Sequence, residues 1–240
     1  MTPNVYDLYA ACEGTWPPAR IWEAHGATLR DGQGGGKRVS AATTDQVSGP
    51  DALSQLEHDM RDVGQSPLFM IREGDDVLDQ TLAANGYDVI DPVNMYLAPI
   101  DALTDRPIPP VTCFEIWPPL AMMAEIWSQG GIGADRLAVM DRAKTKTGIL
   151  ARWNEKPAGV AFAGLHQHIC MVHAVEVLTH QRRQGVAQWM MRKAAVWAQQ
   201  NGAEWISVLC VKENVPANRL YQRLGFEASG AYHYRIKGKT

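Results

Sequence analysis

The sequence predicts a mixed α/β fold, because segments with helical and with strand patterns alternate along the chain. The clearest strand signal is the continuous apolar run at 205–211, which is typical of a strand buried on both faces. The clearest helix signal precedes it, since apolar residues recur on one helical stripe between 184 and 200. Apolar residues make up 46% of the 240-residue chain, which is enough for a sizeable core.

The second half of the chain is the easier part to assign. Its strand segments are β-rich or apolar, and its helical segments show apolar residues at intervals of three and four. The expected elements are, in order, a strand at 111–117, helices at 119–129 and 133–144, a hairpin at 147–165, a strand at 169–178, a helix at 184–200, a strand at 205–211, a helix at 214–224 and one or two strands at 226–236. The order ends on a strand–helix–strand crossover.

The first half resembles a worn copy of part of that order. Two strands are expected around a turn at Gly34-Gly35-Gly36, followed by a helix at 50–64 and a strand at 67–73. The glycine run does not lead from an apolar strand into a helix, so a flexible hairpin tip is favoured over a nucleotide loop. A proline-rich segment at 103–111 is interpreted as an extended connector between the halves.

The repeat is most visible in the last helix and strand of each half. Superposing Gly86 on Gly225 places Leu82 opposite Tyr221, and it places Met95 of the first half opposite a tyrosine of the second, Tyr234. We interpret this as a weak internal repeat. The first half has no counterpart of the glycine-containing helix start at 182–187, so any cofactor is expected in the second half.

Composition limits the possible function classes. The net charge of −3, from 23 basic and 26 acidic residues, argues against a general nucleic-acid binder and leans slightly towards a cationic acceptor. The N-terminus lacks a basic region followed by an apolar run, and no apolar stretch is long enough to span a bilayer, so no signal peptide or membrane partner is expected. The four cysteines are far apart without a CxxC, which favours a cytoplasmic setting over a disulfide framework.

The start of the helix at 184–200 lacks the side chains that cap helices best, Ser, Thr, Asp or Asn. A first turn leaves backbone N–H groups unpaired and partly positive, so an anion fits there. Glycine permits close approach, and arginines add charge for a pyrophosphate. The predicted phosphate-binding residues are Arg182, Arg183, Gln184, Gly185, Val186 and Ala187. The alternative is a plain helix start with a chance glycine.

A second motif lies on the predicted helix at 214–224. It consists of Asn214, Ala217, Leu220, Tyr221, Leu224, Gly225 and Phe226. Together with the glycine-containing helix start, it resembles the GNAT superfamily of acyl-coenzyme A-dependent N-acyltransferases. The resemblance covers roughly residues 111–236. It departs from the family pattern at Thr179, where proline is frequent, and at Ala187, where glycine is commoner.

The resemblance implies a mixed, mostly antiparallel twisted sheet with helices on both faces, the GNAT fold. It also implies a smaller, degenerate GNAT-like N-terminal domain. The expected division is an N-terminal domain at 1–103, a linker at 104–110 and a catalytic domain at 111–240.

The resemblance also implies where acetyl-coenzyme A would bind. The strands at 169–178 and 205–211 would part at their ends and leave a notch for it. Backbone groups around Val175, Glu176 and Val177 would pair with the pantetheine, and the amides of 183–187 would hold the pyrophosphate. Asn214 and Ala217 complete the expected cofactor site.

An amine attacks a thioester only after losing its proton, so the chemistry requires a base. Glu176 is the candidate base through water, with a side chain pointing opposite to those of Val175 and Val177; a solvated strand-end carboxylate is the alternative. The N–H of Val177 is the candidate donor to an oxyanion. Tyr221 matches the family's tyrosine acid, with a buried core tyrosine as the alternative. His173 is a second candidate base, expected on the face opposite to Glu176.

The sequence therefore predicts an N-acetyltransferase that moves an acetyl group from acetyl-coenzyme A to a primary amine by direct attack in a ternary complex. The alternative is a non-catalytic acyl-coenzyme A sensor or protein-interaction module on the same fold. No metal is expected, because His166 and His168 flank a turn and no carboxylate or cysteine cluster joins them. A longer acyl chain, the small-molecule or peptide acceptor and the oligomeric state are left open.

Overall fold

The computed structural model of the protein describes residues 1–47, 49 and 51–238. In the second half the elements agree closely with the predicted segments. They are β5 (Cys113–Ile116), α5 (Ala121–Gln129), α6 (Ala134–Arg142), β6 (Thr145–Trp153), β7 (Lys156–His166), β8 (Ile169–Val177), the 3-10 helix η2 (Thr179–Gln181), α7 (Val186–Gln200), β9 (Trp205–Val211), α8 (Val215–Arg223) and β10 (Glu227–Lys237).

The first half begins with a helix that the sequence reasoning missed. Its elements are α1 (Val5–Thr15), β1 (Arg20–Ala24), β2 (Ala27–Asp31), the 3-10 helix η1 (Lys37–Val39), α2 (Ala52–Asp62), β3 (Leu68–Ile71), α3 (Asp76–Ala84), β4 (Tyr87–Pro99) and α4 (Asp101–Thr104). The signal for α1 was a capping box. The Asn4 side chain accepts from the N–H of Asp7, whose carboxylate accepts from the N–H of Asn4.

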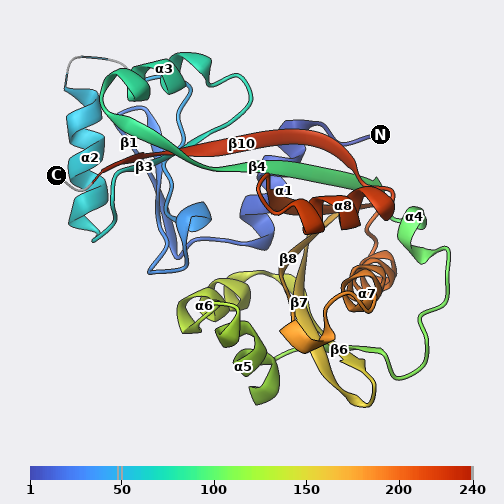
Figure 1. Cartoon of the computed structure of the whole chain (residues 1–240). Helices are drawn as coiled ribbons and strands as arrows, with labels where there is room; N and C mark the ends of the chain where they lie inside the picture. Colours follow the sequence, from blue (N-terminus) through green and yellow to red (C-terminus); the bar gives the residue numbers. More distant parts are fainter. Residues whose placement is uncertain (48, 50, 239–240) are drawn as a thin grey trace.

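One eight-stranded sheet runs through both halves, in the order β3-β10-β4-β9-β8-β7-β6-β5. Every neighbouring pair in it is antiparallel except β8 and β9, which are parallel. β1 and β2 form a separate two-stranded sheet. Figure 1 shows β4 and β10 side by side across the upper part of the molecule.

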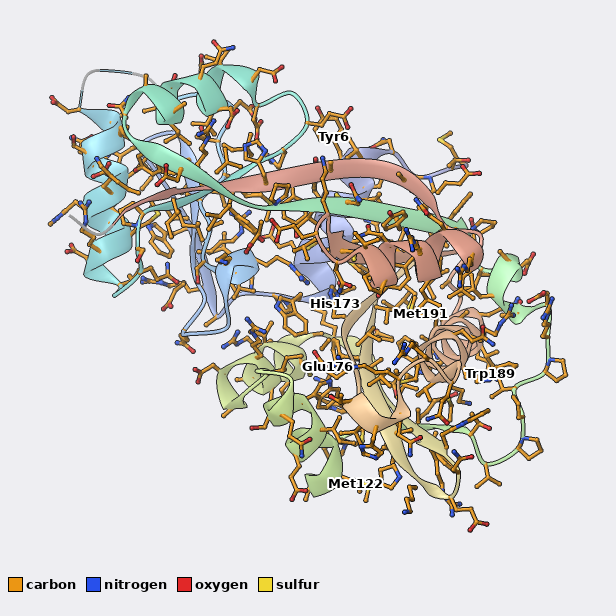
Figure 2. All side chains as sticks on the ribbon, in the orientation of Figure 1. Tyr6, Met122, His173, Glu176, Trp189 and Met191 are labelled. Atoms are coloured by element: carbon orange, nitrogen blue, oxygen red, sulfur yellow. The ribbon has the colours of Figure 1, made fainter. Side chains whose placement is uncertain are left out.

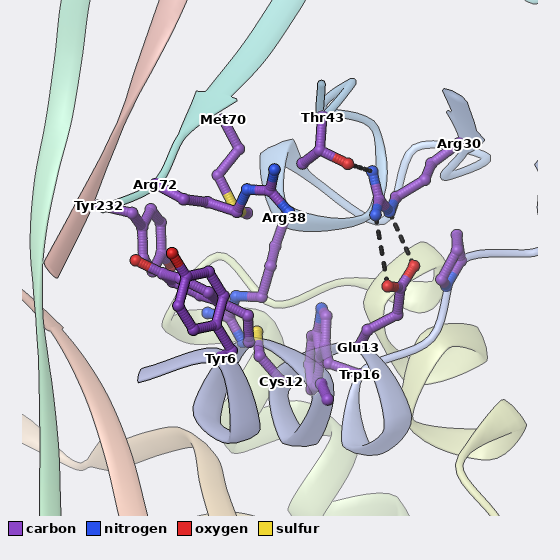
Figure 3. Close-up of a pocket in the computed structure, with 13 residues that line it drawn as sticks. Tyr6, Cys12, Glu13, Trp16, Arg30, Arg38, Thr43, Met70, Arg72 and Tyr232 are labelled. Carbon is purple, nitrogen blue, oxygen red and sulfur yellow. Dashed lines mark hydrogen bonds and ion pairs between the residues drawn. The ribbon is translucent and has the colours of Figure 1, made fainter. Parts of the chain in front are cut away.

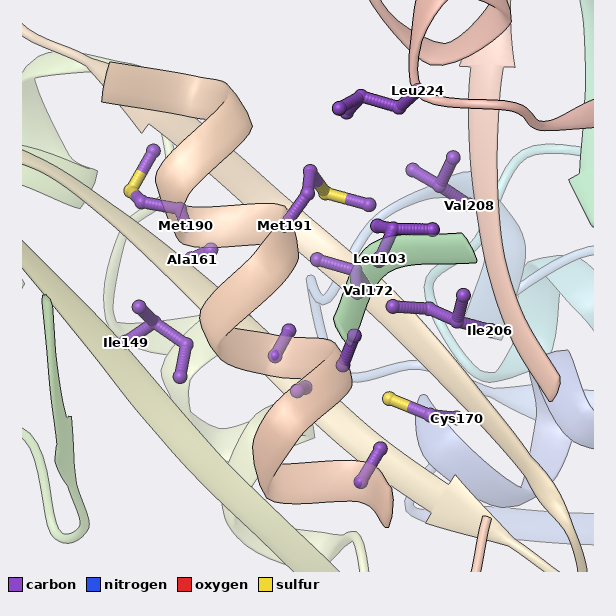
Figure 4. Packing of buried hydrophobic residues seen from close by; sticks show 14 of the residues in the cluster. Leu103, Ile149, Ala161, Cys170, Val172, Met190, Met191, Ile206, Val208 and Leu224 are labelled. Carbon is purple, nitrogen blue, oxygen red and sulfur yellow. The ribbon is translucent and has the colours of Figure 1, made fainter. Parts of the chain in front are cut away.

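Helices cover both faces of this sheet. On one face, Met190 and Met191 of α7 pack against side chains of β6, β7 and β8 (Figure 4). On the other face, α5 and α6 pack against Phe162 of β7. Because successive side chains of a strand point to opposite faces, Val172 of β8 packs with α7 and Met171 packs with α1. The predicted fold class is confirmed.

The two halves exchange their last strands. β4 of the first half lies between β9 and β10 and pairs antiparallel with both. β10 of the second half in turn pairs with β3. The segments α3–β4 and α8–β10, which form the weak repeat, thus have the same helix–strand order and end in neighbouring strands. The division into 1–103, 104–110 and 111–240 remains a prediction, and residues 239–240 lie outside the described part.

The expected hairpin around the glycine run is wrong. β1 and β2 pair across a turn at His25 and Gly26. The glycines instead lie against α6, where a Cβ on Gly35 would come within 2.4 Å of the Val139 side chain. Because glycine has no side chain, the chain before η1 can approach α6 closely. This contact fixes η1, and with it Arg38, beside the second half.

Among the described residues, no helix has both the length and the apolar character needed to cross a membrane.

The exchange of strands predicts that the chain stays assembled after a cut between its halves. A protease site inserted between the exposed residues Arg106 and Pro107 allows cleavage in the connector. The two fragments should co-elute in size-exclusion chromatography, because β4 is hydrogen-bonded to β9 and β10. Uncleaved protein carrying the same insertion is the control. Separation of the fragments without denaturant would contradict the exchange.

Candidate active site

The only parallel strand pair in the described sheet is also the place where it opens. β8 and β9 pair from Ile169 with Trp205 to Val172 with Val208, and no further. Beyond these residues β8 continues along β7, and β9 continues along β4. A notch therefore lies between the carboxyl ends of β8 and β9, as expected from the sequence.

A β-bulge in β8 accompanies this parting. Ala174 has a positive φ of 51°, and the β7–β8 register shifts between Val160 and Phe162. The indole Nε1 of Trp127 in α5 donates to the Ala174 carbonyl at 2.8 Å. An extra residue in one strand bends it and increases its twist. Trp127 thereby holds β8 in a shape that departs from β9.

Because of the bulge, the His173 side chain lies on a different face of the sheet, relative to Glu176, from the one predicted. His173 pairs with Phe162 and Glu176 pairs with Val160, two residues of β7 whose side chains share a face. His173 and Glu176 therefore share that face too, contrary to the expectation from strict alternation. Figure 2 labels both residues.

Backbone groups of the notch edge are available from β8. The Leu178 N–H donates to the Ala158 carbonyl of β7 at 2.9 Å. Because backbone groups alternate in direction along a strand, those of Val175 and Val177 point away from β7 and into the notch. The side chains of Val175 and Val177 pack with the α7 cluster, so that of Glu176 points to the opposite face.

The Glu176 side chain lies against the end of α5. A Cβ added to Gly130 would come within 2.4 Å of its Cδ, so glycine at this position makes room for the carboxylate. A small cavity beside it is bounded by Gln129, Thr179 and Arg182. Burial raises the pKa of Glu176 above its ordinary value, and the charge of Arg182 offsets this in part. A carboxylate with a raised pKa is the better proton acceptor.

His173 is not available as a base. Arg38 Nη1 donates to its Nδ1 at 2.8 Å, which leaves the proton on Nε2. Nε2 lies 2.8 Å from the Thr15 hydroxyl, which itself donates to the Ala11 carbonyl. Burial, and then the charge of Arg38, hold the pKa of His173 well below its ordinary value. Both ring nitrogens are engaged, and the residue is 4% exposed.

The start of α7 is open. Gly185 has a φ of 82°, and no side chain of a described residue caps the helix. Arg183 is also left-handed, with a φ of 61°, and it is exposed. Two predicted phosphate ligands make other contacts: Arg182 Nε donates to the Val177 carbonyl at 3.0 Å, and Gln184 Nε2 donates to the His180 carbonyl at 3.2 Å. The unpaired first turn fits an anion.

Tyr221 lies on α8 and is 5% exposed, packed between Tyr96 and Phe226 with ring centroids 5.9 Å from each. Its hydroxyl has no hydrogen-bond partner among the described residues. The hydroxyl oxygen is not fully enclosed. Burial, more than the nearby Cys210, raises the pKa of Tyr221 well above its ordinary value. The hydroxyl therefore stays protonated as a donor at neutral pH.

Sequence reasoning missed the residue that fixes α8. Asn218 is buried, and its Oδ1 accepts from Tyr96 Oη at 2.8 Å and from Asn94 Nδ2 at 3.0 Å. Its Nδ2 donates to the carbonyls of Val211 and Asn214. The first half thus anchors the helix of Tyr221 through β4. The available signal was a second asparagine, one turn after Asn214.

The predicted cofactor residues on α8 have a structural role as well. The Asn214 side chain accepts from the N–H of Ala217 at 3.3 Å and so acts as the N-cap. Asn214 is exposed and Ala217 is partly exposed. Within the described ranges, no three His, Cys, Asp or Glu side chains gather as a metal site would require.

The chain is similar to known proteins in sequence and in fold. Residues 111–226 match the model of the acetyltransferase (GNAT) family. An uncharacterized N-acetyltransferase of Bacillus subtilis, YobR, is 36% identical over 63 residues, a stretch that is 26% of this chain and only 26% of that relative.

Two solved structures share the fold. A GCN5-related N-acetyltransferase from Kribbella flavida has a TM-score of 0.70 at 17% identity, covering 98% of this chain and 95% of that one. A tandem GNAT protein from the clavulanic acid biosynthesis pathway has a TM-score of 0.60 at 13% identity, covering 79% and 70%. The fold match extends over the first half, which lies outside the family model.

The raised pKa of Glu176 predicts a pH-dependent stability difference. The pKa of this carboxyl is higher in the folded than in the unfolded protein. Its ionisation therefore lowers the free energy of unfolding as the pH rises from the unfolded-state pKa through the folded-state pKa. Glu176→Gln should therefore have the higher Tm at about pH 7, and the difference should shrink towards about pH 4. Glu155→Gln, in the exposed β6–β7 turn, is the control. A Tm difference that is constant over this range would contradict the prediction.

Proposed function

The chain belongs to the acetyltransferase (GNAT) family through residues 111–226, and we propose that it transfers an acetyl group from acetyl-coenzyme A to a primary amine. The transfer is direct, within a ternary complex. The observation that carries this proposal is the notch between β8 and β9, which leads to the open start of α7. A stretch of β8 that has no partner in β9 and an anion site thus lie in sequence along one path.

The residues present fit the coenzyme. The first turn of α7, from Gln184 to Ala187, offers amides for a diphosphate, and Arg182 and Arg183 add positive charge. The backbone groups of Val175 and the N–H of Val177 are available for the amides of the pantetheine arm, while the Val177 carbonyl already accepts from Arg182. Asn214 and Ala217 border the start of α8, across the gap on the β9 side.

Acetyl-coenzyme A supplies a thioester carbonyl that an amine can attack. In the proposed mechanism Glu176 accepts the proton of the amine through water. The N–H of Val177, which points into the notch, donates to the carbonyl oxygen as it gains charge. The Tyr221 hydroxyl, held protonated by its raised pKa, donates a proton to the departing sulfur.

The proposal extends to the organisation of the chain. Residues 111–240 act as the catalytic part, and residues 1–103 form a degenerate GNAT-like part that walls the acceptor site. The four cysteines Cys12, Cys113, Cys170 and Cys210 are free thiols, which supports a reducing, cytoplasmic setting.

Gly185→Asp tests the cofactor site. The change adds a negative charge and a side chain where the diphosphate is proposed to bind, so isothermal titration should show coenzyme A affinity reduced by about 100-fold or more. Gly202→Asp is the matched control. It lies at the other end of α7 with a similar φ of 86° and nothing within 4 Å of its Cβ, so it has the same backbone strain. Equal affinity in both variants would refute the placement.

Tyr221→Phe tests the proton donor. Loss of a positioned acid should lower kcat on the order of 10²-fold while leaving the Kd for acetyl-coenzyme A nearly unchanged. Wild-type kcat should not decline until well above about pH 10, the ordinary pKa of tyrosine. Tyr87→Phe removes another buried hydroxyl, one that donates to Glu57 away from the notch, and is the control. An unchanged kcat would assign Tyr221 to packing alone.

A further inference from the structure

A cavity of about 480 Å³ lies where the first half meets the notch. It reaches Ala174 of β8 and Val211 of β9, which lie just beyond the last β8–β9 pair. Its other walls include Trp16, Gly36 and Tyr232. A volume of this size accommodates a small molecule. The cavity is thus the space from which an acceptor amine would enter the notch.

The charge in this cavity is opposite in sign to that of the whole chain. Lys37, Arg38 and Arg136 line it, with Asp91 as its one carboxylate. Asp91 is paired with Lys37. His173, which also faces the cavity, is neutral because its Nδ1 is an acceptor. Two positive charges therefore have no carboxylate from the lining residues.

Arg38 is the less solvated of these cations. Its guanidinium lies 5.5 Å from the ring centroid of Trp16, and Figure 3 shows it near Cys12 and Tyr232. The neighbouring arginines are paired, Arg30 with Glu13 at 2.8 Å and Arg72 with an aspartate. Among the described residues Arg38 has no carboxylate within ion-pair distance. A poorly solvated charge without a counter-charge is costly.

The three nitrogens of the Arg38 guanidinium differ in their contacts. Nη1 is used by His173, and Nε is enclosed without an acceptor. Nη2 is not enclosed, and its nearest polar neighbours are the Tyr232 hydroxyl and the Cys12 thiol, neither of which carries a negative charge at neutral pH. A carboxylate is a strong acceptor for a guanidinium N–H. An anion in the cavity therefore reaches the guanidinium at Nη2, because Nε is enclosed.

We propose that Arg38 binds a carboxylate of the acceptor, so that the acceptor class is an amino acid, a small molecule with both a primary amine and a carboxylate. With its carboxylate at Arg38, the amine of such a molecule extends towards Ala174 and Val211, into the notch. Arg136 and Lys37 add to the attraction from the cavity wall. The inference rests on the proposed function, and it replaces the slight lean towards a cationic acceptor.

Matched acceptors test this proposal. Thiol release from acetyl-coenzyme A is measured with α-, β- and γ-amino acids, each against the carboxamide of the same skeleton and against a simple alkylamine. The wild type should prefer the acid in its best pair by at least about 10-fold in kcat/KM. The amine of an α-amino amide loses its proton more readily than that of the acid, so intrinsic reactivity would favour the amide. A preference for the acid therefore reports recognition.

Two variants and a control assign the preference to Arg38. Arg38→Met should reduce the acid-to-amide ratio to about one, and Arg38→Lys should retain a smaller preference, since it keeps the charge without the planar edge. Arg20→Met is the control, because Arg20 is exposed and contacts Trp22 away from the cavity. Its ratio and rate should equal those of the wild type. Should Arg38→Met fail to fold, the acid-to-amide ratios of the wild type and of Arg38→Lys still test the proposal.

The outcomes separate the two proposals. Turnover of amides and alkylamines as fast as of acids by the wild type would overturn the role of Arg38 and leave the acetyltransferase proposal standing. A preference for acids that persists in folded Arg38→Met would do the same. Absence of thiol release with every amine, in protein that binds acetyl-coenzyme A, would overturn both.

Discussion

The bulge at Ala174 is the constraint on which the rest of the site depends. A strand that continued to alternate regularly would stay beside β9 and leave no notch. The Trp127 indole fixes the bulge through a 2.8 Å hydrogen bond to the Ala174 carbonyl. One extra residue then accounts for three features: the strands part after Val172, the backbone groups of Val175 and Val177 face the gap, and Glu176 turns towards α5.

The exchange of strands explains why the first half is needed for a site whose motifs all lie in the second. β4 supplies Tyr96, which holds Asn218 and so fixes the helix that carries Tyr221. The glycine run lets η1 approach α6, which places Arg38 at the cavity beside the notch. The first half contributes position and charge, while the second contributes the groups proposed to act on the thioester.

Much of the fold could be predicted because its signals are local. Apolar periodicity indicated the helices and strands of residues 111–236, and the two motifs indicated the family whose model matches residues 111–226. The bulge was not predictable, since an alanine with positive φ leaves no compositional trace, and His173 was therefore assigned to the wrong face. The strand exchange was missed because the last strands of the two similar halves are equivalent candidates for pairing. Which of them pairs with which neighbour depends on tertiary packing, which local sequence patterns do not report. The glycine run was misread because glycine marks close approach as well as turns.

The site residues themselves remain predictions, and the central one is that the notch and the open start of α7 hold the coenzyme together. Hydrogen–deuterium exchange resolved to single amides, with and without saturating coenzyme A, tests it most directly. We expect slower exchange at Val175, Val177 and residues 184–188, because these groups carry no acceptor from the protein. Slowing confined to other segments, with these amides unchanged while coenzyme A is bound, would contradict the account.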